Sequence, residues 1–280
     1  MAARLSQGKA LAAIGQICST NSLTHNLAQC RVVIQKAVAA GAKAVFLPEA
    51  SDYIGASPDE SIALCKPANQ SPFIIGLQED ARKHSLPISV GVHEPSDDPR
   101  SHRIKNTLLW IDEAGQIAHR YQKLHMFDID IPGGPVLKES NTTEPGSTIL
   151  APFDTIVGKV GAAICFDLRF PEIALALKRQ NAEVILFPSA FTIPTGKAHW
   201  EPLLRARAIE CQAYVIAAAQ VGAHNEKRTS YGHSIVINPW GEVIAELGGE
   251  KTEEPEVILA EIDFSELEAV RRRIPLPRRT

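Results

Sequence analysis

Apolar residues along the chain gather into short runs, and these alternate with longer segments in which apolar positions recur at helical spacing. Apolar runs of about four to eight residues are typical of buried strands, whereas a spacing of about three to four residues is typical of amphipathic helices. The pattern predicts strands over residues 11–17, 43–48, 87–94, 160–165, 183–191, 214–221 and 255–263, and helices over residues 21–41, 71–86, 171–182, 199–213 and 264–274.

Two further segments predict β-hairpins and thereby narrow the fold class. Residues 106–123 turn around Gly115, and residues 232–247 turn around Gly241. Hairpins argue against a purely parallel sheet, while the alternation of strands and helices favours an α/β protein whose sheets are covered by helices. Because no repeat or linker divides the sequence, we expect a single domain over residues 1–280.

Long polar loops are the exceptions to this regular alternation. They are predicted over residues 93–105 and 127–150. Long loops inside compact domains are often functional, so these two segments are candidates for contributing to a site.

Composition and charge exclude several classes of protein. The 280 residues carry a formal net charge of −3 and are 45% hydrophobic. So weak a charge argues against a nucleic-acid partner. No apolar stretch approaches the ~18–20 residues that span a bilayer, so we expect no membrane partner. The N-terminal stretch, with Arg4 and Lys9, predicts a first strand rather than a signal peptide.

The cysteines indicate a reducing compartment. They are odd in number and widely scattered, and none has the spacing of a zinc site. We therefore expect no metal and no disulfide, and a cytoplasmic protein, with mitochondrial import through an alternative start as an additional location. The five positions are Cys18, Cys30, Cys65, Cys165 and Cys211.

Three predicted strands end in residues that carry chemistry. Glu49 follows the strand in "AVFLPEAS", Lys123 ends the first hairpin in "HRYQKLHMF", and Cys165 ends the strand in "GAAICFDLRF". Ligand sites of α/β folds tend to lie beyond the carboxyl ends of strands, so these side chains are expected to converge.

The chemistry of these three residues is coherent. Cys165 would be a nucleophile at a strand-to-helix turn, Glu49 a base that accepts the thiol proton, and Lys123 a cation that stabilises an oxyanion. The backbone N–H of Phe166 would assist Lys123. Taken singly, each residue also has a plain structural interpretation: a packed thiol, a turn-capping carboxylate and a solvated strand end. Spacing alone leaves both interpretations open.

The segments "FLPEAS", "YQKLHMFDIDIPG" and "ICFDLRFPE" resemble the three signature stretches of the nitrilase superfamily of carbon–nitrogen hydrolases, in the same order and spacing. The resemblance covers essentially the whole chain. It implies a catalytic triad of Glu49, Lys123 and Cys165, with Glu139 of "LKES" helping to position the lysine and the substrate. It also implies a four-layer α-β-β-α sandwich, a homodimer or larger homo-oligomer, and no cofactor.

Within the superfamily, the chain is most similar to the branch that acts on deaminated glutathione. The resemblance rests on "PEASDYIGASPDESIAL" and "AHNEKRTSYGHS". It implies hydrolysis of a small-molecule 2-oxo acid amide, with 2-oxoglutarate and Cys-Gly as products. Two other functions stay open: an ω-amidase acting on 2-oxoglutaramate or 2-oxosuccinamate, and a catalytically silent interaction protein. The intact triad argues against the second.

A 2-oxo acid substrate needs a cationic clamp. Arg169 is the expected clamp because a guanidinium holds a carboxylate through two hydrogen bonds; the alternative is an ion pair with Asp167 or Glu172. Phe191 and Thr195 are expected to line the pocket, although core packing and a turn hydroxyl would also explain them. The remaining candidate, His125, is expected to make a local hydrogen bond.

Overall fold

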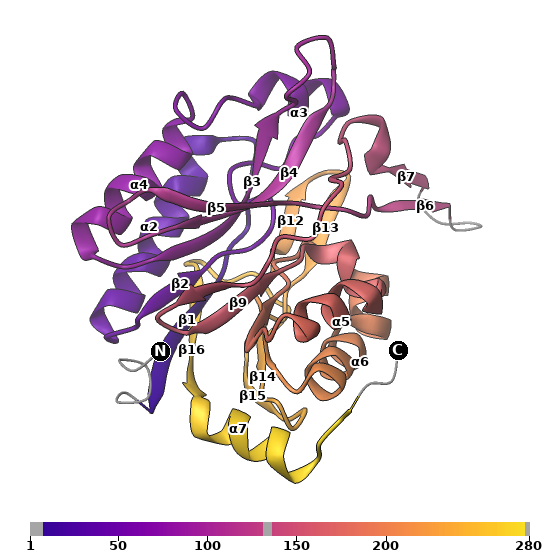
Figure 1. Cartoon of the computed structure of the whole chain (residues 1–280). Helices are drawn as coiled ribbons and strands as arrows, with labels where there is room; N and C mark the ends of the chain where they lie inside the picture. The colour runs from indigo at the N-terminus through magenta and orange to yellow at the C-terminus, as the bar shows by residue number, and fades with distance from the viewer. Residues whose placement is uncertain (1–7, 131–135, 278–280) are drawn as a thin grey trace.

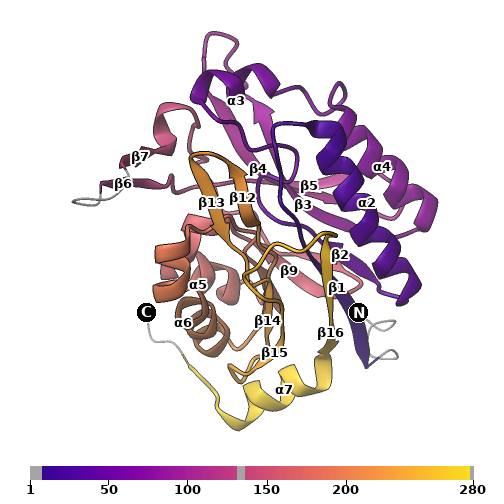
Figure 2. The same cartoon turned by 180° about the vertical axis from the view of Figure 1, so that it is seen from behind.

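Two six-stranded sheets lie face to face between two layers of helices in the computed structural model, which describes residues 8–130 and 136–277 (Figures 1 and 2). The first sheet has the order β16-β1-β2-β3-β4-β5 and the second the order β15-β14-β11-β10-β9-β8. Helices α2 and α4 cover the first sheet, and helices α5 and α6 cover the second (Figure 1). This arrangement confirms the predicted α/β class and the four-layer sandwich.

The first sheet is formed by β1 (Lys9–Gln16), β2 (Ala44–Phe46), β3 (Ile88–Pro95), β4 (Ile104–Ile111), β5 (Ile117–Gln122) and β16 (Glu256–Asp263). The second is formed by β8 (Phe153–Thr155), β9 (Gly158–Ala162), β10 (Val184–Leu186), β11 (Tyr214–Ala217), β14 (Ile235–Ile237) and β15 (Val243–Glu246). Two small hairpins pair β6 (Asp128–Asp130) with β7 (Val136–Lys138) and β12 (Val221–Asn225) with β13 (Arg228–Tyr231).

The helices are α2 (Leu23–Ala39), α3 (Pro58–Leu64), α4 (Pro72–His84), α5 (Pro171–Arg179), α6 (Ile193–Cys211) and α7 (Phe264–Arg273), with short 3-10 turns η1 (Glu139–Asn141) and η2 (Cys165–Arg169). None of the described helices is both long and apolar enough to cross a bilayer.

Alternation of side chains along the strands builds two separate cores. On β1, Ala12 and Ile14 join the cluster between the sheets, whereas Ala13 joins the cluster beneath α2 and α4. Because successive strand residues point to opposite faces, one strand serves both layers. The cluster between the sheets continues under α5 and α6 through residues such as Leu177 and Leu204.

Helix starts follow the sequence signals where those signals are local. Ser22 caps α2, and Ser71 caps α4 with Pro72 in its first turn. Helix α6 begins at Ile193, six residues before the predicted start at residue 199. The prediction missed residues 193–198 because they show no apolar periodicity. They are helical in the structure, with a proline in the first turn, where its fixed φ suits a helix start.

Polar segments were the main omissions of the prediction. Neither α3 nor the β12–β13 hairpin was predicted, because neither contains an apolar run long enough to indicate an element. The loop predicted over residues 127–150 contains β6, β7 and η1, and residues 131–135 within it lie outside the described residues. The predicted first strand corresponds to β1. Residues 1–7 and 278–280 also lie outside the described residues.

Candidate active site

Side chains from the ends of strands in both sheets meet between them. Glu49 lies three residues beyond β2, Lys123 follows β5 directly, and Cys165 lies three residues beyond β9. The N–H of Cys165 donates to the carbonyl of Pro188 at 3.0 Å, which extends the pairing of β9 with β10. The N–H of Gly91 on β3 donates to the Pro48 carbonyl at 3.0 Å and ties down the Glu49 segment.

Glycine is required at position 91 because of this close approach. A Cβ atom there would lie 2.5 Å from the Cα of Glu49 and 2.9 Å from the carbonyl oxygen of Pro48. The backbone of Glu49 therefore packs directly on the backbone of β3.

Lys123 forms the centre of a buried ion-pair network. Its Nζ donates to Oε1 of Glu49 at 2.9 Å, and to Oε1 and Oε2 of Glu139 at 3.1 and 2.9 Å. The side chains of Lys123 and Glu49 are 2% and 4% exposed. Since an ammonium has three protons, the two carboxylates use all of them. The structure thus brings together three of the four predicted catalytic residues.

The ion pairs set the charge state of these groups. Burial opposes ionisation of both Glu49 and Lys123. The Lys123 ammonium more than offsets this cost for Glu49, whose pKa lies below its ordinary value. The carboxylates of Glu139 and Glu49 likewise raise the pKa of Lys123 well above its ordinary value. At neutral pH the network therefore holds one cation and the Glu49 carboxylate in their charged forms.

Cys165, the fourth predicted catalytic residue, lies beside this network at the start of η2. Burial raises the pKa of its thiol, the Glu49 carboxylate raises it further, and Lys123 opposes the shift only in part. The resting group is therefore a neutral thiol. Oε2 of Glu49 is buried and has no hydrogen-bond partner among the described residues, so one carboxylate oxygen is left to accept a proton.

The backbone around the site is strained. Cys165 has φ 46° and Ala50, next to Glu49, has φ 53°, both in the left-handed region that side chains other than glycine seldom adopt. Such strain persists only where surrounding contacts enforce it, and it concentrates at functional sites.

A buried carboxylate joins the cysteine turn to the lysine segment. Asp167 is fully buried, and its Oδ2 accepts from the hydroxyl of Tyr121 at 2.7 Å. Its Oδ1 accepts from the backbone N–H of His125 at 3.0 Å and lies 2.8 Å from Nδ1 of the same residue. The predicted local hydrogen bond of His125 is thus present, and Asp167 is not available as the ion-pair partner of Arg169.

Arg169 lies between two aromatic rings. Its guanidinium carbon is 5.6 Å from the ring centres of both Phe166 and Phe191, and Nη1 is 3.2 Å from Nδ1 of His199. Burial lowers the pKa of Arg169, although a guanidinium stays charged at neutral pH. Among the described side chains, no carboxylate forms an ion pair with it, in contrast to the structural alternative considered for this residue.

Phe191 and Thr195 differ in their surroundings. Phe191 is 7% exposed and packs on Trp200 with ring centres 4.8 Å apart, so one face meets the core and the other meets Arg169. The Thr195 hydroxyl lies 2.8 Å from that of Thr192 and donates to the carbonyl of the same residue. The hydroxyl of Thr195 is thus engaged within the first turn of α6.

Sequence reasoning missed one residue at the centre of the site. Asn106, at 4% exposure, donates from Nδ2 to Oε1 of Glu49 at 2.8 Å and to Oε1 of Glu139 at 3.3 Å. It opens the segment "NTLLWI", and an amide on the inward face of an apolar strand was the signal available.

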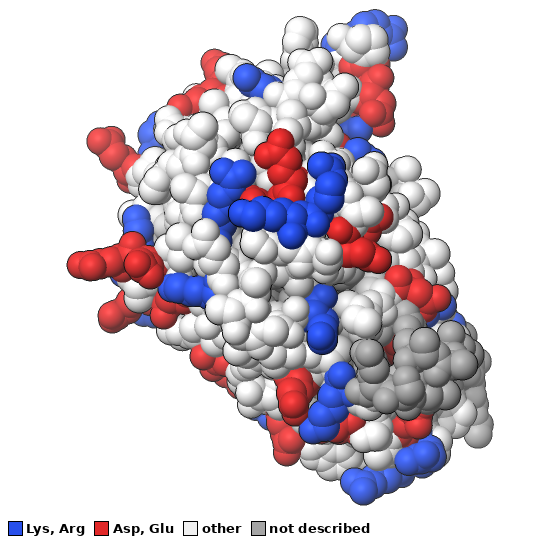
Figure 3. Space-filling view, turned by 90° about the vertical axis from the view of Figure 1, so that its left-hand side faces the viewer, with Lys and Arg blue, Asp and Glu red and all other residues white. Residues whose placement is uncertain are grey.

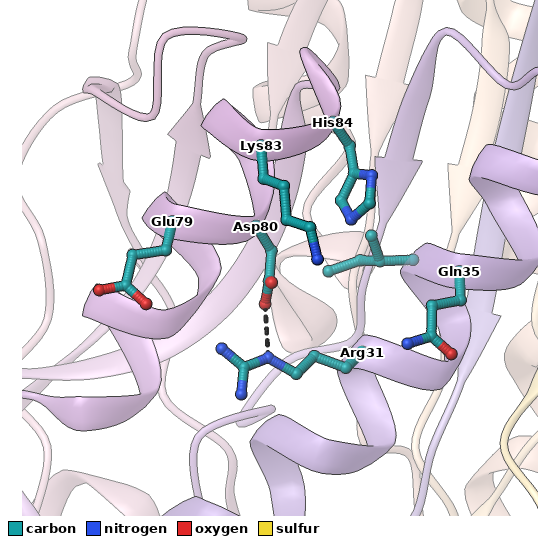
Figure 4. A pocket seen from close by; sticks show the side chains of 7 residues that line it. Arg31, Gln35, Glu79, Asp80, Lys83 and His84 are labelled. Carbon is teal, nitrogen blue, oxygen red and sulfur yellow. Dashed lines mark hydrogen bonds and ion pairs between the residues drawn. The ribbon is translucent and has the colours of Figure 1, made fainter.

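Other features of the described residues do not form an alternative site. Within the described residues, no group of His, Cys, Asp and Glu has the arrangement of a metal site. A hollow lies between α2 and α4, where Arg31 pairs with Asp80 at 2.8 Å (Figure 4). Charges of both signs are interspersed on the face of the molecule seen in Figure 3. The hollow is on the outer side of the first sheet, remote from Cys165, and Arg31, which lines it together with Lys83, is already paired.

Comparison with known proteins identifies the family. The chain matches the carbon-nitrogen hydrolase family over residues 11–272. It is 50% identical over 270 residues to the probable hydrolase nit2 of Schizosaccharomyces pombe, which covers 96% of this chain and 97% of that protein. It is 43% identical over 268 residues to the deaminated glutathione amidase of Mus musculus, covering 95% of this chain and 81% of that protein.

A solved structure gives the same result. The crystal structure of the Caenorhabditis elegans NitFhit protein matches with a TM-score of 0.88 at 42% identity, covering 96% of this chain and 64% of that one. This chain therefore spans less than two thirds of the length of NitFhit. The chain belongs to the carbon-nitrogen hydrolase family, which confirms the resemblance to the nitrilase superfamily and the predicted enzyme class.

Replacing Lys123 with methionine tests the energetics of the network. We expect a loss of about 3–5 kcal/mol in the free energy of unfolding at about pH 7.5, because buried carboxylates lose their cation. The loss should shrink at about pH 5.5, since burial raises the pKa of an unpaired carboxyl until it is protonated and neutral. In the unmodified protein, the depressed pKa of Glu49 contributes stability above its ordinary pKa of 4.5, and this is lost as pH falls.

Urea unfolding at the two pH values measures the effect. Lys36→Met is the matched control, because its ion pair with Glu254 is solvent-exposed and should contribute less than about 1 kcal/mol. A deficit in Lys123→Met that is equal at both pH values would contradict the account.

Proposed function

We propose that the chain is an amidase that hydrolyses the side-chain amide of deaminated glutathione to 2-oxoglutarate and Cys-Gly through a thioester on Cys165. The observation that carries the proposal is the Glu49 carboxylate beside a buried thiol: Lys123 holds its Oε1, and no described residue forms a hydrogen bond with its Oε2. The name of the mouse relative, deaminated glutathione amidase, supports the choice of substrate.

Formation of the thioester uses the three groups in turn. As the sulfur of Cys165 attacks the amide carbon, its proton moves to Oε2 of Glu49. The carbonyl oxygen becomes an oxyanion, stabilised by the charge of Lys123 and by the backbone N–H of Phe166. When the oxyanion collapses, the carbon–nitrogen bond breaks, and Glu49 returns the proton to the leaving nitrogen, so that Cys-Gly departs as an amine.

Hydrolysis of the thioester reverses these roles. Water attacks the thioester carbon and gives one proton to Glu49. Collapse of the second tetrahedral intermediate breaks the carbon–sulfur bond, and the sulfur recovers the proton from Glu49. The 2-oxo acid leaves as a carboxylate after its acidic proton passes to solvent. Glu139 takes no proton in this scheme; its role is to hold Lys123 in place through two hydrogen bonds.

Arg169 supplies the recognition of the 2-oxo acid end. Its guanidinium is half-buried and lies against Phe166 and Phe191. A guanidinium partly removed from water gains more from a carboxylate than a fully solvated one, because the local dielectric is lower. Contact with the two rings and with Nδ1 of His199, 3.2 Å from Nη1, limits the movement of the guanidinium. Thr195 is assigned to the pocket wall near this end.

We also propose an assembly, a domain organisation and a location for the chain. The 280 residues form one hydrolase domain, since both core clusters draw on distant parts of the chain. Pairing into a homodimer would cover Ile209 and Trp240, which are 50% and 52% exposed. Cys165 and Cys18 are unpaired thiols, as expected of a cytoplasmic or mitochondrial protein in a reducing compartment.

Product analysis tests the proposed reaction. Purified protein is incubated with deaminated glutathione and, separately, with 2-oxoglutaramate, and the products are identified by mass spectrometry. We expect preferential release of Cys-Gly and 2-oxoglutarate from deaminated glutathione, and no turnover by Cys165→Ala at unchanged thermal stability. Preference for 2-oxoglutaramate would assign ω-amidase activity instead. Turnover of neither amide would refute the reaction, and substantial turnover by Cys165→Ala would refute the mechanism.

Substitution of Arg169 by lysine tests the clamp. The ammonium keeps the charge but loses the planar fork, so we expect kcat/KM for 2-oxo acid amides to fall by about tenfold or more, mainly through KM. Arg272→Lys is the control, since the Arg272 side chain is 74% exposed on α7. Steady-state kinetics of Arg169→Lys that match the unmodified protein would show that Arg169 serves only the structure.

A further inference from the structure

The Asn106 amide connects the two carboxylates of the site. Its Nδ2 donates to Oε1 of Glu49 at 2.8 Å and to Oε1 of Glu139 at 3.3 Å. The same two oxygens accept from Nζ of Lys123 at 2.9 and 3.1 Å. Each of these oxygens is therefore shared between one charged donor and one neutral donor, and Asn106 closes a ring of four side chains.

The orientation of this amide is fixed by its surroundings. If the amide were turned over, its oxygen would face two carboxylate oxygens, and like partial charges would repel. With Nδ2 toward the carboxylates, Oδ1 of Asn106 is buried and has no partner among the described residues. A buried acceptor without a partner costs free energy. The two hydrogen bonds that Nδ2 donates must therefore offset the lost hydration of Oδ1.

Lys123 alone does not determine which oxygen of Glu49 faces the thiol. Its three protons are all used, and only one of them reaches Glu49. A carboxylate held by a single donor is free to rotate about its terminal bond and to exchange its oxygens. A second donor on the same oxygen removes that freedom, and Asn106 is that donor.

A backbone hydrogen bond fixes the position of Asn106 relative to Lys123. It lies on β4 (Ile104–Ile111), and its carbonyl accepts from the N–H of Lys123 at 2.9 Å. The strand that carries the amide is thus hydrogen-bonded to the residue that carries the cation. Any displacement of Lys123 would be shared by Asn106, so the donors move together.

We propose that Asn106 is a positioning residue, which holds Oε1 of Glu49 on Lys123 and thereby keeps Oε2 directed to the Cys165 proton. The inference rests on the proposed role of Glu49 as base. It also gives Asn106 a second effect: a hydrogen bond to the charged form of a carboxylate favours that form, so the amide helps keep Glu49 ionised.

The main test replaces Asn106 with leucine, which has a similar shape and no donor. We expect kcat to fall about 10- to 100-fold, because the base is no longer aligned, while KM changes less than about twofold. The acidic limb of the pH profile of kcat/KM should move upward by about one unit, since Glu49 loses a donor to its charged form. A purely structural role would lower the amount of active enzyme without moving this limb.

Thr107→Val is the matched control on the same strand. The Thr107 hydroxyl is buried with no partner in the described part of the chain, and this residue points to the opposite face of the sheet from Asn106. Its loss should therefore leave kcat and the pH profile unchanged. Asn106→Ser is the second variant if leucine prevents folding. Its smaller hydroxyl does not span both carboxylates, and we expect the same upward movement of the acidic limb.

Alkylation of Cys165 by iodoacetamide separates this proposal from the proposed reaction. Its rate depends on proton transfer from the thiol but not on the amide substrate. We expect slower alkylation in Asn106→Leu, with the pH dependence displaced in the same direction. If the unmodified protein hydrolyses neither amide, the proposed function fails, and alkylation still decides the role of Asn106. An unchanged acidic limb together with unchanged alkylation in both Asn106 variants would overturn the inference.

Discussion

The buried ammonium of Lys123 is the interaction on which the arrangement of the site depends. Removing a cation from water costs several kcal/mol, and the cost is recovered only if its partners are charged and well placed. Glu49, three residues beyond β2, and Glu139, in η1, satisfy this requirement at hydrogen-bond distance. The first sheet must therefore bring the ends of β2 and β5 to the same region, and η1, which follows β7, must lie against it.

This charge balance also explains why Cys165, the proposed nucleophile, rests as a thiol. Reactive cysteines commonly have a depressed pKa, next to cations or helix N-termini. Cys165 instead lies beside a carboxylate and is buried, and both conditions raise its pKa. Ionisation of the sulfur is thus favourable only when Glu49 takes the proton and a carbonyl carbon takes the sulfur's electrons. Such a site couples thiolate formation to substrate and limits reactions of the free thiolate.

The strands, most of the helices and the strand-end residues were predictable because they depend on local patterns, whereas the four-layer arrangement came from the family resemblance. Apolar runs locate the strands, Ser22 and Ser71 mark helix starts, and Glu49 interrupts an apolar segment. Contacts between distant segments carry no local signal. The pairing of Asn106 with Glu49 spans 57 positions, and the β12–β13 hairpin is polar, so neither follows from periodicity. The expected role of Glu139 came from the family resemblance, and that of Arg169 from the carboxylate of the substrate that the resemblance implies, rather than from spacing.

Trapping the acyl group is the most direct test of a thioester on Cys165. Hydroxylamine competes with water for such an intermediate and converts the acyl group to a hydroxamate, whichever leaving group was expelled. The unmodified protein is given deaminated glutathione or 2-oxoglutaramate at a fixed concentration of hydroxylamine, and the ratio of hydroxamate to 2-oxoglutarate is measured. A common intermediate predicts the same ratio from both amides. Ratios that differ between the amides, or hydrolysis without any hydroxamate, would contradict a shared acyl-enzyme.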